Sequence, residues 1–221
     1  MNETSARPKK FYITLLRHGE STGNAESRWQ GQAEFPLNER GRAQAQALAE
    51  RWKREKMKFD FVISSPLLRA RETAEIIASK LGLLVEFDPL WLERNNGEFA
   101  GLTNHEVQTN FSHPEFGTPY DAVGTHGEGD WELFLRAGQA LHDLLKREPA
   151  RYLIVSHGGL LNQLMHTIVG IVPQAHNSGT SFRFGNTAFA KVIYSPNQHR
   201  WMIDKINDHI HWQDADFEKH A

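Results

Sequence analysis

The chain has 221 residues, of which 39% are hydrophobic and 24% are charged, and this composition is typical of one globular domain. Its 25 Lys and Arg residues against 27 Asp and Glu residues give a formal net charge of -2, which argues against nucleic acid or an anionic membrane as a partner. Cysteine is absent, which excludes disulfides, thiolate metal sites and a cysteine nucleophile.

The first predicted strand and helix lie near the start of the chain. Residues 11–16 form a short apolar run rich in β-forming residues, and the polar turn RHGE follows at 17–20. We therefore expect a strand that ends in a loop. Asn38 is a suitable N-cap for a helix whose apolar residues recur at helical spacing up to Trp52.

A second strand and helix follow the first pair. Residues 59–63 predict a buried strand, and Ser65 and Pro66 favour the N-cap and the first position of the next helix. Small and apolar residues recur at helical spacing until Gly82, which predicts the end of this helix. Residues 83–87 indicate a third, weaker strand.

The second half of the chain predicts two further helices and three strands. An amphipathic helix is expected over residues 130–146, and the apolar residues 152–155 give the strongest strand prediction. The sequence SHGG then leads into an apolar helix that ends at Gly170. Residues 188–194 and 201–206 predict a hairpin because a Ser-Pro-Asn turn separates them.

The alternation of strands and helices predicts the fold class. It implies right-handed βαβ crossovers, and therefore an α/β three-layer sandwich with a mostly parallel central sheet and helices on both faces. Residues 1–221 show no repeat or linker, so we expect one domain, with residues 95–128 as a cap insertion. No apolar run approaches the ~20 residues of a membrane span, so a cytoplasmic protein is expected.

Three of the predicted strands end in residues that suit an anion. RHG follows the first strand at 17–19, SS at 64–65 and then Arg69 follow the second, and SHG follows the fourth at 156–158. In an open parallel sheet these carboxyl ends converge on one pocket. Guanidinium groups bind phosphate oxygens bidentately, and free N–H groups at the starts of the nearby helices add positive charge. The sequence therefore predicts a site for a tetrahedral dianion.

Further motifs accompany these strand ends, in a fixed order, along most of the chain. It comprises LLRHGEST at 15–22, QGQAEFPLNERGRAQA at 30–45, SSPLLRARETA at 64–74, LERNNGEFAGLT at 92–103, GEG at 127–129, SHGG at 156–159, GNTA at 185–188 and INDHI at 206–210. In this content and order the chain resembles the histidine phosphatases, also called the phosphoglycerate-mutase-like superfamily. The resemblance covers about residues 11–210.

The resemblance implies a role for each matching residue. His18 is implied as the nucleophile that becomes phosphohistidine, and Glu93 as the acid that protonates the leaving oxygen. Contacts to the phosphoryl group are implied for Arg17, Asn24, Arg69, His157 and Gly158. Such a transfer mainly needs positioned positive charge, so neither a metal nor a cofactor is expected.

The charges around the site predict its protonation. Two guanidinium groups beside His18 disfavour the imidazolium form, so we expect a neutral, nucleophilic imidazole at neutral pH. Glu93 must conversely keep a proton while substrate is bound, which an approaching phosphate dianion favours.

Most of the 12 histidines have no assigned chemistry. His209 and His211 lie two positions apart, which on a strand puts both on one face, but no third residue with metal-ligand spacing is near. A metal-dependent hydrolase is therefore the weakest alternative, and it predicts inactivation by a chelator.

The expected cap favours transfer of the phosphoryl group to water over its transfer back to a phosphoglycerate. Residues 102–130 contain no Lys or Arg, whereas a mutase must bind a carboxylate and a second phosphate at the far end of its substrate. SHGG at 156–159 also resembles the phosphatase branch, since mutases tend to place Asn after the His-Gly pair. We therefore expect a phosphatase acting on a small phosphorylated metabolite, with broad specificity compatible with the sequence. A cofactor-dependent phosphoglycerate mutase and a non-catalytic phospho-ligand binding protein remain alternatives.

Aromatic residues in and beside the same segment suggest the nature of the leaving group. Phe99, Phe111, Phe116 and Tyr120, with acidic neighbours, favour a neutral, partly apolar or cationic group over a sugar bisphosphate. The sequence does not determine the oligomeric state.

Overall fold

The computed structural model describes residues 9–111, 116–175 and 178–212, and its centre is a six-stranded sheet of order β3-β2-β4-β1-β5-β6. The strands are β1 (Phe11–Arg17), β2 (Phe61–Ser64), β3 (Val85–Phe87), β4 (Arg151–Ser156), β5 (Phe189–Ser195) and β6 (Arg200–Asp208). β1, β2, β3 and β4 pair in parallel, whereas β5 is antiparallel to β1 and β6 to β5. The predicted mostly parallel sheet and its C-terminal hairpin are confirmed.

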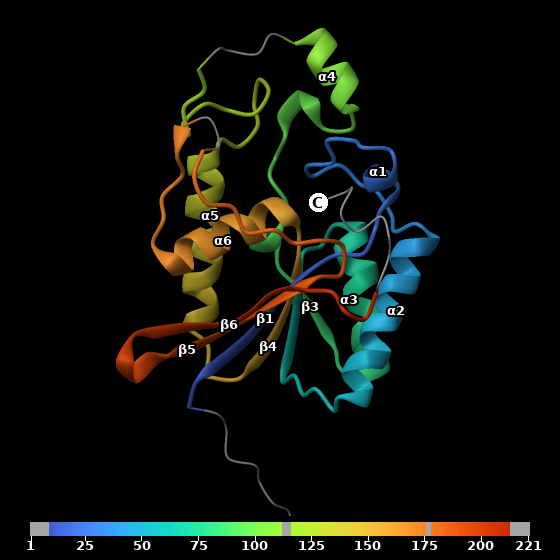
Figure 1. Ribbon diagram of the computed structural model, residues 1–221, viewed down its shortest axis with the longest axis vertical. Coiled ribbons are helices and arrows are strands. Elements are labelled where there is room, and N and C mark those ends of the chain that lie inside the picture. Colours follow the sequence, from blue (N-terminus) through green and yellow to red (C-terminus); the bar gives the residue numbers. More distant parts are fainter. Residues whose placement is uncertain (1–8, 112–115, 176–177, 213–221) are drawn as a thin grey trace, which may run out of the picture.

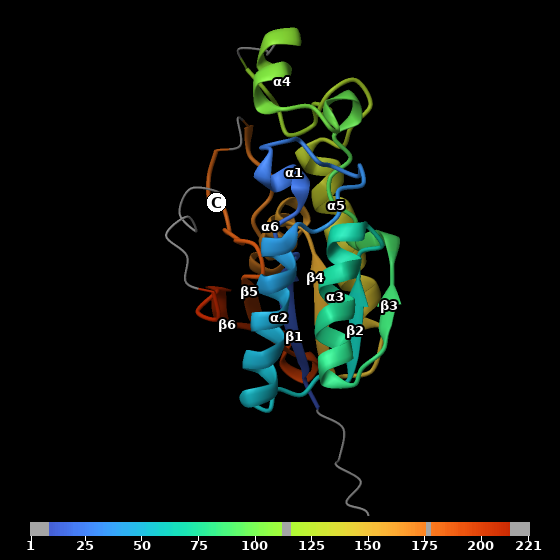
Figure 2. The ribbon, with the colours of Figure 1, turned by 90° about the vertical axis from the view of Figure 1, so that its right-hand side faces the viewer.

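Helices cover both faces of this sheet (Figure 1, Figure 2). The long helices are α2 (Glu39–Arg54), α3 (Leu68–Leu81), α5 (Asp130–Leu145) and α6 (Gly158–Val169). Alternation along β1 separates the two cores: Ile13 and Leu15 join the core under α5 and α6, whereas Leu16 joins the core under α2 and α3. The expected three-layer α/β sandwich is confirmed. None of the helices in the described part is long and apolar enough to cross a membrane.

Three helix ends follow the predicted signals. The Asn38 side chain accepts a hydrogen bond from the backbone of the first turn and caps α2. Gly82 and Gly170 end α3 and α6 in the left-handed conformation, which glycine adopts without a Cβ penalty. These helix ends were predictable because each capping residue is next to its helix in the sequence.

The start of α3 differs from the prediction. Ser65 and Pro66 were expected as N-cap and first position, but Leu67 is the N-cap and makes no side-chain hydrogen bond. Ser65 Oγ instead lies 2.8 Å from Nε2 of His157. The same hydroxyl also accepts a long hydrogen bond from the N–H of Leu67 (3.4 Å), so Ser65 contacts both the helix start and the strand-end cluster.

The segment expected as a cap, residues 95–128, lies above the carboxyl ends of the parallel strands in Figure 1. It contains two elements that were not predicted, the 3₁₀ turn η2 (Gly97–Phe99) and the helix α4 (Asn104–Asn110). Thr103 begins α4 with a capping box. Residues 112–115 of the cap lie outside the described residues.

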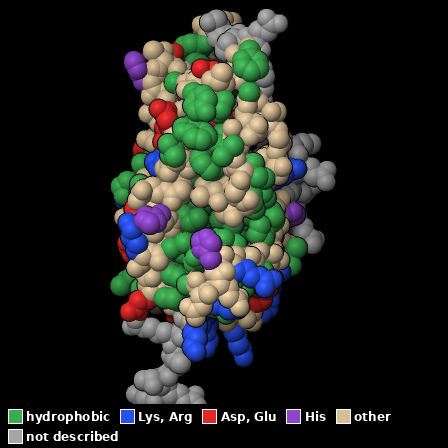
Figure 3. Space-filling model, turned by 90° about the vertical axis from the view of Figure 1, so that its left-hand side faces the viewer, with side chains coloured by type: hydrophobic (Ala, Val, Ile, Leu, Met, Phe, Trp, Pro, Cys, Tyr) green, Lys and Arg blue, Asp and Glu red, His purple; other side chains and the backbone are tan. Residues whose placement is uncertain are grey.

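Aromatic residues in and beside the cap fall into two groups. Phe99 packs edge-on against Trp29 and Phe111, with ring centroids 5.6 and 4.7 Å apart. Phe116 and Tyr120 are 61% and 69% exposed. Figure 3 shows that hydrophobic side chains gather at the surface over the upper part of the face that it draws. The first group therefore joins the cap to the loop of Trp29, while the second faces solvent.

Candidate active site

Two histidines meet where neighbouring parallel strands end. Arg17, the last residue of β1, is in register with Ser156, the last residue of β4, and the backbone N–H of His18 donates to the Ser156 carbonyl (3.0 Å). His157 follows as the N-cap of α6. The two rings lie 5.1 Å apart between centroids, and both residues are buried. The predicted convergence of these strand ends is observed.

A hydrogen bond fixes the tautomer of His18. Its Nδ1 lies 2.6 Å from the carbonyl oxygen of Gly19. Because a carbonyl oxygen only accepts, Nδ1 carries the proton and donates it. In the neutral ring Nε2 is then unprotonated, and no hydrogen-bond partner occupies it among the residues that the structure describes. Its lone pair is available to an electrophile.

Burial keeps both histidines neutral. It lowers the pKa of His18 well below the ordinary value, and the guanidinium groups of Arg69 and Arg17 lower it further. The direction agrees with the neutral imidazole expected from the sequence, although burial rather than the arginines is the largest cause. The pKa of His157 is also well below its ordinary value, again through burial first and Arg69 second.

Backbone carbonyls hold the two arginines in place. Nη1 of Arg17 donates to the Phe184 carbonyl (2.7 Å). Arg69 donates from Nη1 to the Ala33 carbonyl (3.0 Å) and from Nη2 to the Gly31 carbonyl (2.6 Å). Burial lowers the pKa of Arg69 to about 10 and also lowers that of Arg17. Both Nε atoms are buried without a hydrogen-bond partner in the described part of the chain. The site therefore holds two ordered positive charges with unmet hydrogen-bonding capacity.

The carboxylate of Glu93 occupies the start of α6. Its Oε2 accepts from the N–H of Gly159 (3.0 Å) and its Oε1 from the N–H of Leu160 (3.1 Å). At the start of α3, Glu34 Oε2 accepts in the same way from the N–H of Leu68 (2.9 Å). The expectation that these helix N–H groups stay free for a phosphate is therefore wrong for these positions, because carboxylates already satisfy them.

Asn24 lies in the short helix α1 (Thr22–Ala25), which was not predicted. Its Oδ1 accepts from the N–H (3.1 Å) and the hydroxyl (2.9 Å) of Ser21, and from Nδ2 of Asn186 (3.3 Å). With the oxygen occupied, Nδ2 of Asn24 is the donor that remains for a ligand.

One cavity of about 270 Å³ gathers most of the predicted site residues. Arg17, His18, Asn24, Arg69 and Glu93 line it. The sequence did not single out its other lining residues, which are Arg28, Trp29, Gln30, Gly31, Arg94, Asn96 and Gly159. Gln30, Gly31, Arg94, Asn96 and Gly159 stand in motifs that were recognised, whereas Arg28 and Trp29 carry no local signal.

His157 and Gly158 are not among the lining residues, although both adjoin them. His157 has Nε2 bound to Ser65 and a buried Nδ1 that lacks a partner among the described residues. A Cβ placed on Gly158 would stand 3.6 Å from Nε of Arg17, which is ordinary contact. Gly158 therefore lies against the arginine rather than in the cavity wall.

Two further arginines reach the cavity from outside the cap. Arg28 donates from Nε to Glu26 (2.6 Å), and Arg94 donates from Nη2 to Asp130 (2.5 Å). The absence of Lys and Arg from residues 102–130 therefore does not remove all outer positive charge, but each of these arginines is paired with a carboxylate.

An ion pair holds the loop that carries Glu93. Arg136 donates from Nε and Nη2 to the two oxygens of Glu128 (2.7 Å each), and it also donates to the carbonyls of Leu92 (2.7 Å) and Glu93 (3.0 Å). Glu128 accepts in addition from the N–H of Asn95 (2.7 Å). The GEG motif at 127–129 thus contributes a carboxylate that positions this loop.

The described residues contain no group of three or more His, Asp or Glu side chains that could hold a metal ion. His211 instead has Nε2 within 3.0 Å of the Thr187 hydroxyl, and burial lowers its pKa to about 4. The backbone N–H of Thr187 reaches the carbonyls of Arg17 and His18 (3.1 and 3.2 Å). His211 therefore packs behind the end of β1.

Comparison with known sequences identifies a family. A model described as the histidine phosphatase superfamily (branch 1) matches residues 13–209. A protein named probable phosphoglycerate mutase GpmB from Escherichia fergusonii is 34% identical over 208 residues, which covers 90% of this chain and 94% of that protein. A protein of the same name from an Enterobacter species is 33% identical over 211 residues, with the same coverage.

Solved structures with the same fold include phosphatases. A mycobacterial glucosyl-3-phosphoglycerate phosphatase solved with VO3 has a TM-score of 0.75 and 28% identity, covering 89% of this chain and 98% of that chain. A phosphoserine phosphatase variant from Entamoeba histolytica, in complex with phosphoserine, has a TM-score of 0.74 and 26% identity, covering 92% and 100%.

Proposed function

The chain belongs to the histidine phosphatase superfamily, branch 1, and we propose that it hydrolyses small phosphomonoesters through a phosphohistidine on His18, without a metal ion. The state of His18 carries this proposal. Its Nδ1–H donates to the Gly19 carbonyl, and its ring is neutral. Its unprotonated Nε2 has no hydrogen-bond partner among the described residues, and Arg17 and Arg69 line the same cavity.

In the first step the lone pair on His18 Nε2 attacks phosphorus, and the bond from phosphorus to the leaving oxygen breaks with its electron pair moving to that oxygen. Glu93 gives its proton to the oxygen, so that an alcohol departs and a carboxylate remains. The phosphoryl oxygens take hydrogen bonds and positive charge from Arg17, Asn24 and Arg69, which line the cavity, and a hydrogen bond from His157, which adjoins it.

In the second step a water molecule attacks the phosphorus of the phosphohistidine. The carboxylate of Glu93 accepts a proton from this water, and the phosphorus–nitrogen bond breaks with its electron pair returning to Nε2. Inorganic phosphate leaves, and both His18 and Glu93 are restored. These two steps balance without an oxidant, a reductant or a metal ion.

Hydrolysis is favoured over phosphoryl return by the charges at the outer part of the cavity. A mutase holds a second phosphate there, whereas Arg28 and Arg94 are already engaged by Glu26 and Asp130. Residues 102–130, which include most of the cap, add no Lys or Arg. A leaving group without a second phosphate suits this arrangement.

Phosphoglycerate mutase activity is the second candidate, and one observation favours it. Arg28 and Arg94 line the same cavity as His18, so a substrate anion that displaced their carboxylate partners would meet two guanidinium groups. The name of the curated GpmB relatives points in the same direction. The two candidates differ in whether water or a phosphoglycerate receives the phosphoryl group.

A phosphate-release assay on a panel of phosphomonoesters, with and without EDTA and 2,3-bisphosphoglycerate, separates these functions. The wild type should release phosphate in EDTA, His18→Ala should release none, and His142→Ala, an exposed histidine on α5, should match the wild type. Loss of activity in EDTA or its retention in His18→Ala would contradict the proposal. Isomerisation that requires bisphosphoglycerate would establish the mutase, and inactivity on every substrate would favour a binding protein.

A further inference from the structure

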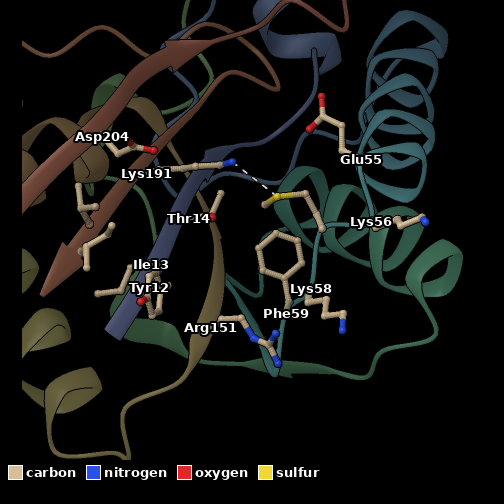
Figure 4. Close-up of a pocket in the computed structure, with 13 residues that line it drawn as sticks. Tyr12, Ile13, Thr14, Glu55, Lys56, Lys58, Phe59, Arg151, Lys191 and Asp204 are labelled. Carbon is tan, nitrogen blue, oxygen red and sulfur yellow. Dashed lines mark hydrogen bonds between the residues drawn. The ribbon is translucent and has the colours of Figure 1, made fainter. Parts of the chain in front are cut away.

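A second cavity lies at the other end of β1 from His18 (Figure 4). Its volume is about 460 Å³, and none of its lining residues belongs to the His18 cavity. Residues 12–14 of β1 and residues 55–59 after α2 form most of its wall, and residues of β4, β5 and β6 complete it. Small-molecule sites in proteins commonly have volumes of roughly 300–1,000 Å³.

An ammonium and a hydroxyl lie side by side in this cavity. Thr14 and Lys191 are cross-strand partners of β1 and β5, so their side chains share one face of the sheet. Nζ of Lys191 has one hydrogen-bond partner among the described residues, Sδ of Met57 at 3.5 Å, which is a weak acceptor. Thr14 is only 5% exposed, and its hydroxyl has no hydrogen-bond partner among the described residues. Both groups therefore have unmet hydrogen-bonding capacity.

Two of the charged residues around the cavity are neutralised by neighbours. Arg151 forms a bidentate pair with Asp60, at 2.6 and 2.9 Å. Glu55 accepts from Nε of Arg51 at 2.8 Å. Arg51 also pairs with Asp208, which accepts in turn from Lys205 at 3.1 Å, so two cations balance these two carboxylates. These pairs contribute little net charge to the interior of the cavity.

The remaining charges leave an excess of positive charge. Lys56, Lys58 and Lys191 line the cavity without a carboxylate at ion-pair distance among the described residues, and Asp204 is the opposing carboxylate that is likewise unpaired there. Burial lowers the pKa of Lys191, which agrees with an ammonium that has lost water without gaining a bonded carboxylate. The cavity is therefore complementary to an anion.

An apolar surface faces these polar groups. Phe59 is 8% exposed, and Figure 4 shows its ring inside the cavity, between Thr14 and Arg151. Tyr12 is 42% exposed on the strand side of the same space. Two rings in the wall of a cavity that also holds an ammonium suit a ligand that is anionic at one end and flat and apolar at the other.

We propose that this cavity binds a small organic anion, whose carboxylate, sulfonate or phosphate group contacts Lys191 and Thr14 while its aromatic body packs on Phe59 and Tyr12. The site is separate from the His18 cavity and does not depend on the reaction proposed there. It is formed by the opposite ends of β1 and β4, so that a ligand can occupy it while the phosphate site is filled.

Fluorescence titration with 8-anilinonaphthalene-1-sulfonate, an aromatic sulfonate, tests the proposal on the folded full chain. The wild type should show saturable binding of one probe. Lys191→Met, which keeps the apolar stem, should raise the dissociation constant about tenfold. Thr14→Val, of nearly equal volume, should raise it about threefold. Lys53→Met removes the same charge from the exposed side of α2 and should stay within about twofold of the wild type.

Three results would overturn the proposal. The first is the absence of saturable probe binding to the wild type. The second is equal affinity in the wild type and in Lys191→Met, with Thr14→Val deciding in the same way if the lysine variant does not fold. The third is displacement of the probe by vanadate, a phosphate analogue, because this would place the probe in the His18 cavity.

Discussion

Replacement of Gly159 by alanine tests how closely Glu93 must be placed. A Cβ on Gly159 would stand 2.6 Å from Oε1 of Glu93 and 3.2 Å from its Cδ. The carboxyl would have to move by about 0.8 Å to reach the ~3.4 Å of ordinary contact. It would then lose the geometry of its bonds to the N–H groups of Gly159 and Leu160.

The neighbouring glycine supplies a matched control. A Cβ on Gly158 would stand 3.6 Å from Nε of Arg17, where no atom has to move. Both glycines lie in the first turn of α6, so both alanine variants gain a similar helix propensity, about 1 kcal/mol at most. A difference between the two variants therefore reports the carboxyl of Glu93 and not the stability of the helix.

The size of the effect follows from the role proposed for Glu93. A displacement of about 1 Å can cost roughly 100-fold in rate, and a general acid contributes roughly 100-fold or more. For glycerol phosphate, whose alkoxide needs a proton to leave, we expect kcat of Gly159→Ala to fall about 30-fold. For p-nitrophenyl phosphate, whose phenolate leaves without one, the fall should be about threefold.

The assay is phosphate release from both substrates by the wild type, Gly158→Ala and Gly159→Ala. The reasoning is refuted if Gly159→Ala loses the same factor on both substrates, because a general acid matters most for the poorer leaving group. It is also refuted if Gly158→Ala and Gly159→Ala are equally impaired, since only the second displaces Glu93.

Three further predictions concern other parts of the molecule. Imidazole shifts of His18 should change little between about pH 5 and pH 8, because burial and two arginines lower its pKa, and a midpoint near neutrality in an NMR titration would contradict this. Asp208→Asn should lower the free energy of unfolding in urea by about 3 kcal/mol at neutral pH, since it breaks a bidentate pair with Arg51 at 2.5 and 3.0 Å. Burial opposes ionisation of Asp208, but the hydrogen bonds from Arg51 outweigh it and hold the pKa of this carboxyl below its usual range. The pair's stability is therefore complete above the unfolded-state pKa of about 4 and is lost as the pH falls through the folded-state pKa, so a wild-type to variant difference that persists unchanged in acid would disprove it. Arg136→Met should lower kcat about tenfold by releasing the loop of Glu93, whereas Arg147→Met, which breaks a surface pair, should leave kcat unchanged, and equal kcat in both variants would show that the loop is held otherwise.

The arrangement of strands could be predicted because each strand has a local apolar pattern and parallel strands converge at one edge. The limits of elements were less predictable. Phe59 belongs to the predicted apolar run, yet it precedes β2, and its ring packs on Trp52 of α2 at 5.1 Å between centroids. On α5, Leu133 is fully buried, whereas Phe134 is only partly buried and packs against Trp131. The burial of these side chains depends on packing against other elements, which the periodicity of apolar residues in the sequence does not reveal.

The site shows the same division. The residues that carry motifs, such as His18 and Arg69, were predictable, but their partners come from distant parts of the chain. Glu93 accepts from N–H groups at the start of α6, and the Ser65 hydroxyl contacts His157 as well as the N–H of Leu67. Arg28 reaches the cavity through a loop that has no distinctive pattern. Each of these contacts depends on the folded arrangement of the loops.

The charges of the site suit the proposed reaction of a phosphate dianion without a large rearrangement. Carbonyls of Gly31, Ala33 and Phe184 hold Arg69 and Arg17 before any ligand arrives. The lowered pKa values of both arginines reflect the water that these charges have lost, and a phosphate dianion would restore the lost stabilisation. Fixed charges of this kind act most strongly where no reorganisation is needed. Because a carboxylate already occupies the start of α6, the arginines rather than the helix supply the positive charge, and the site depends on them.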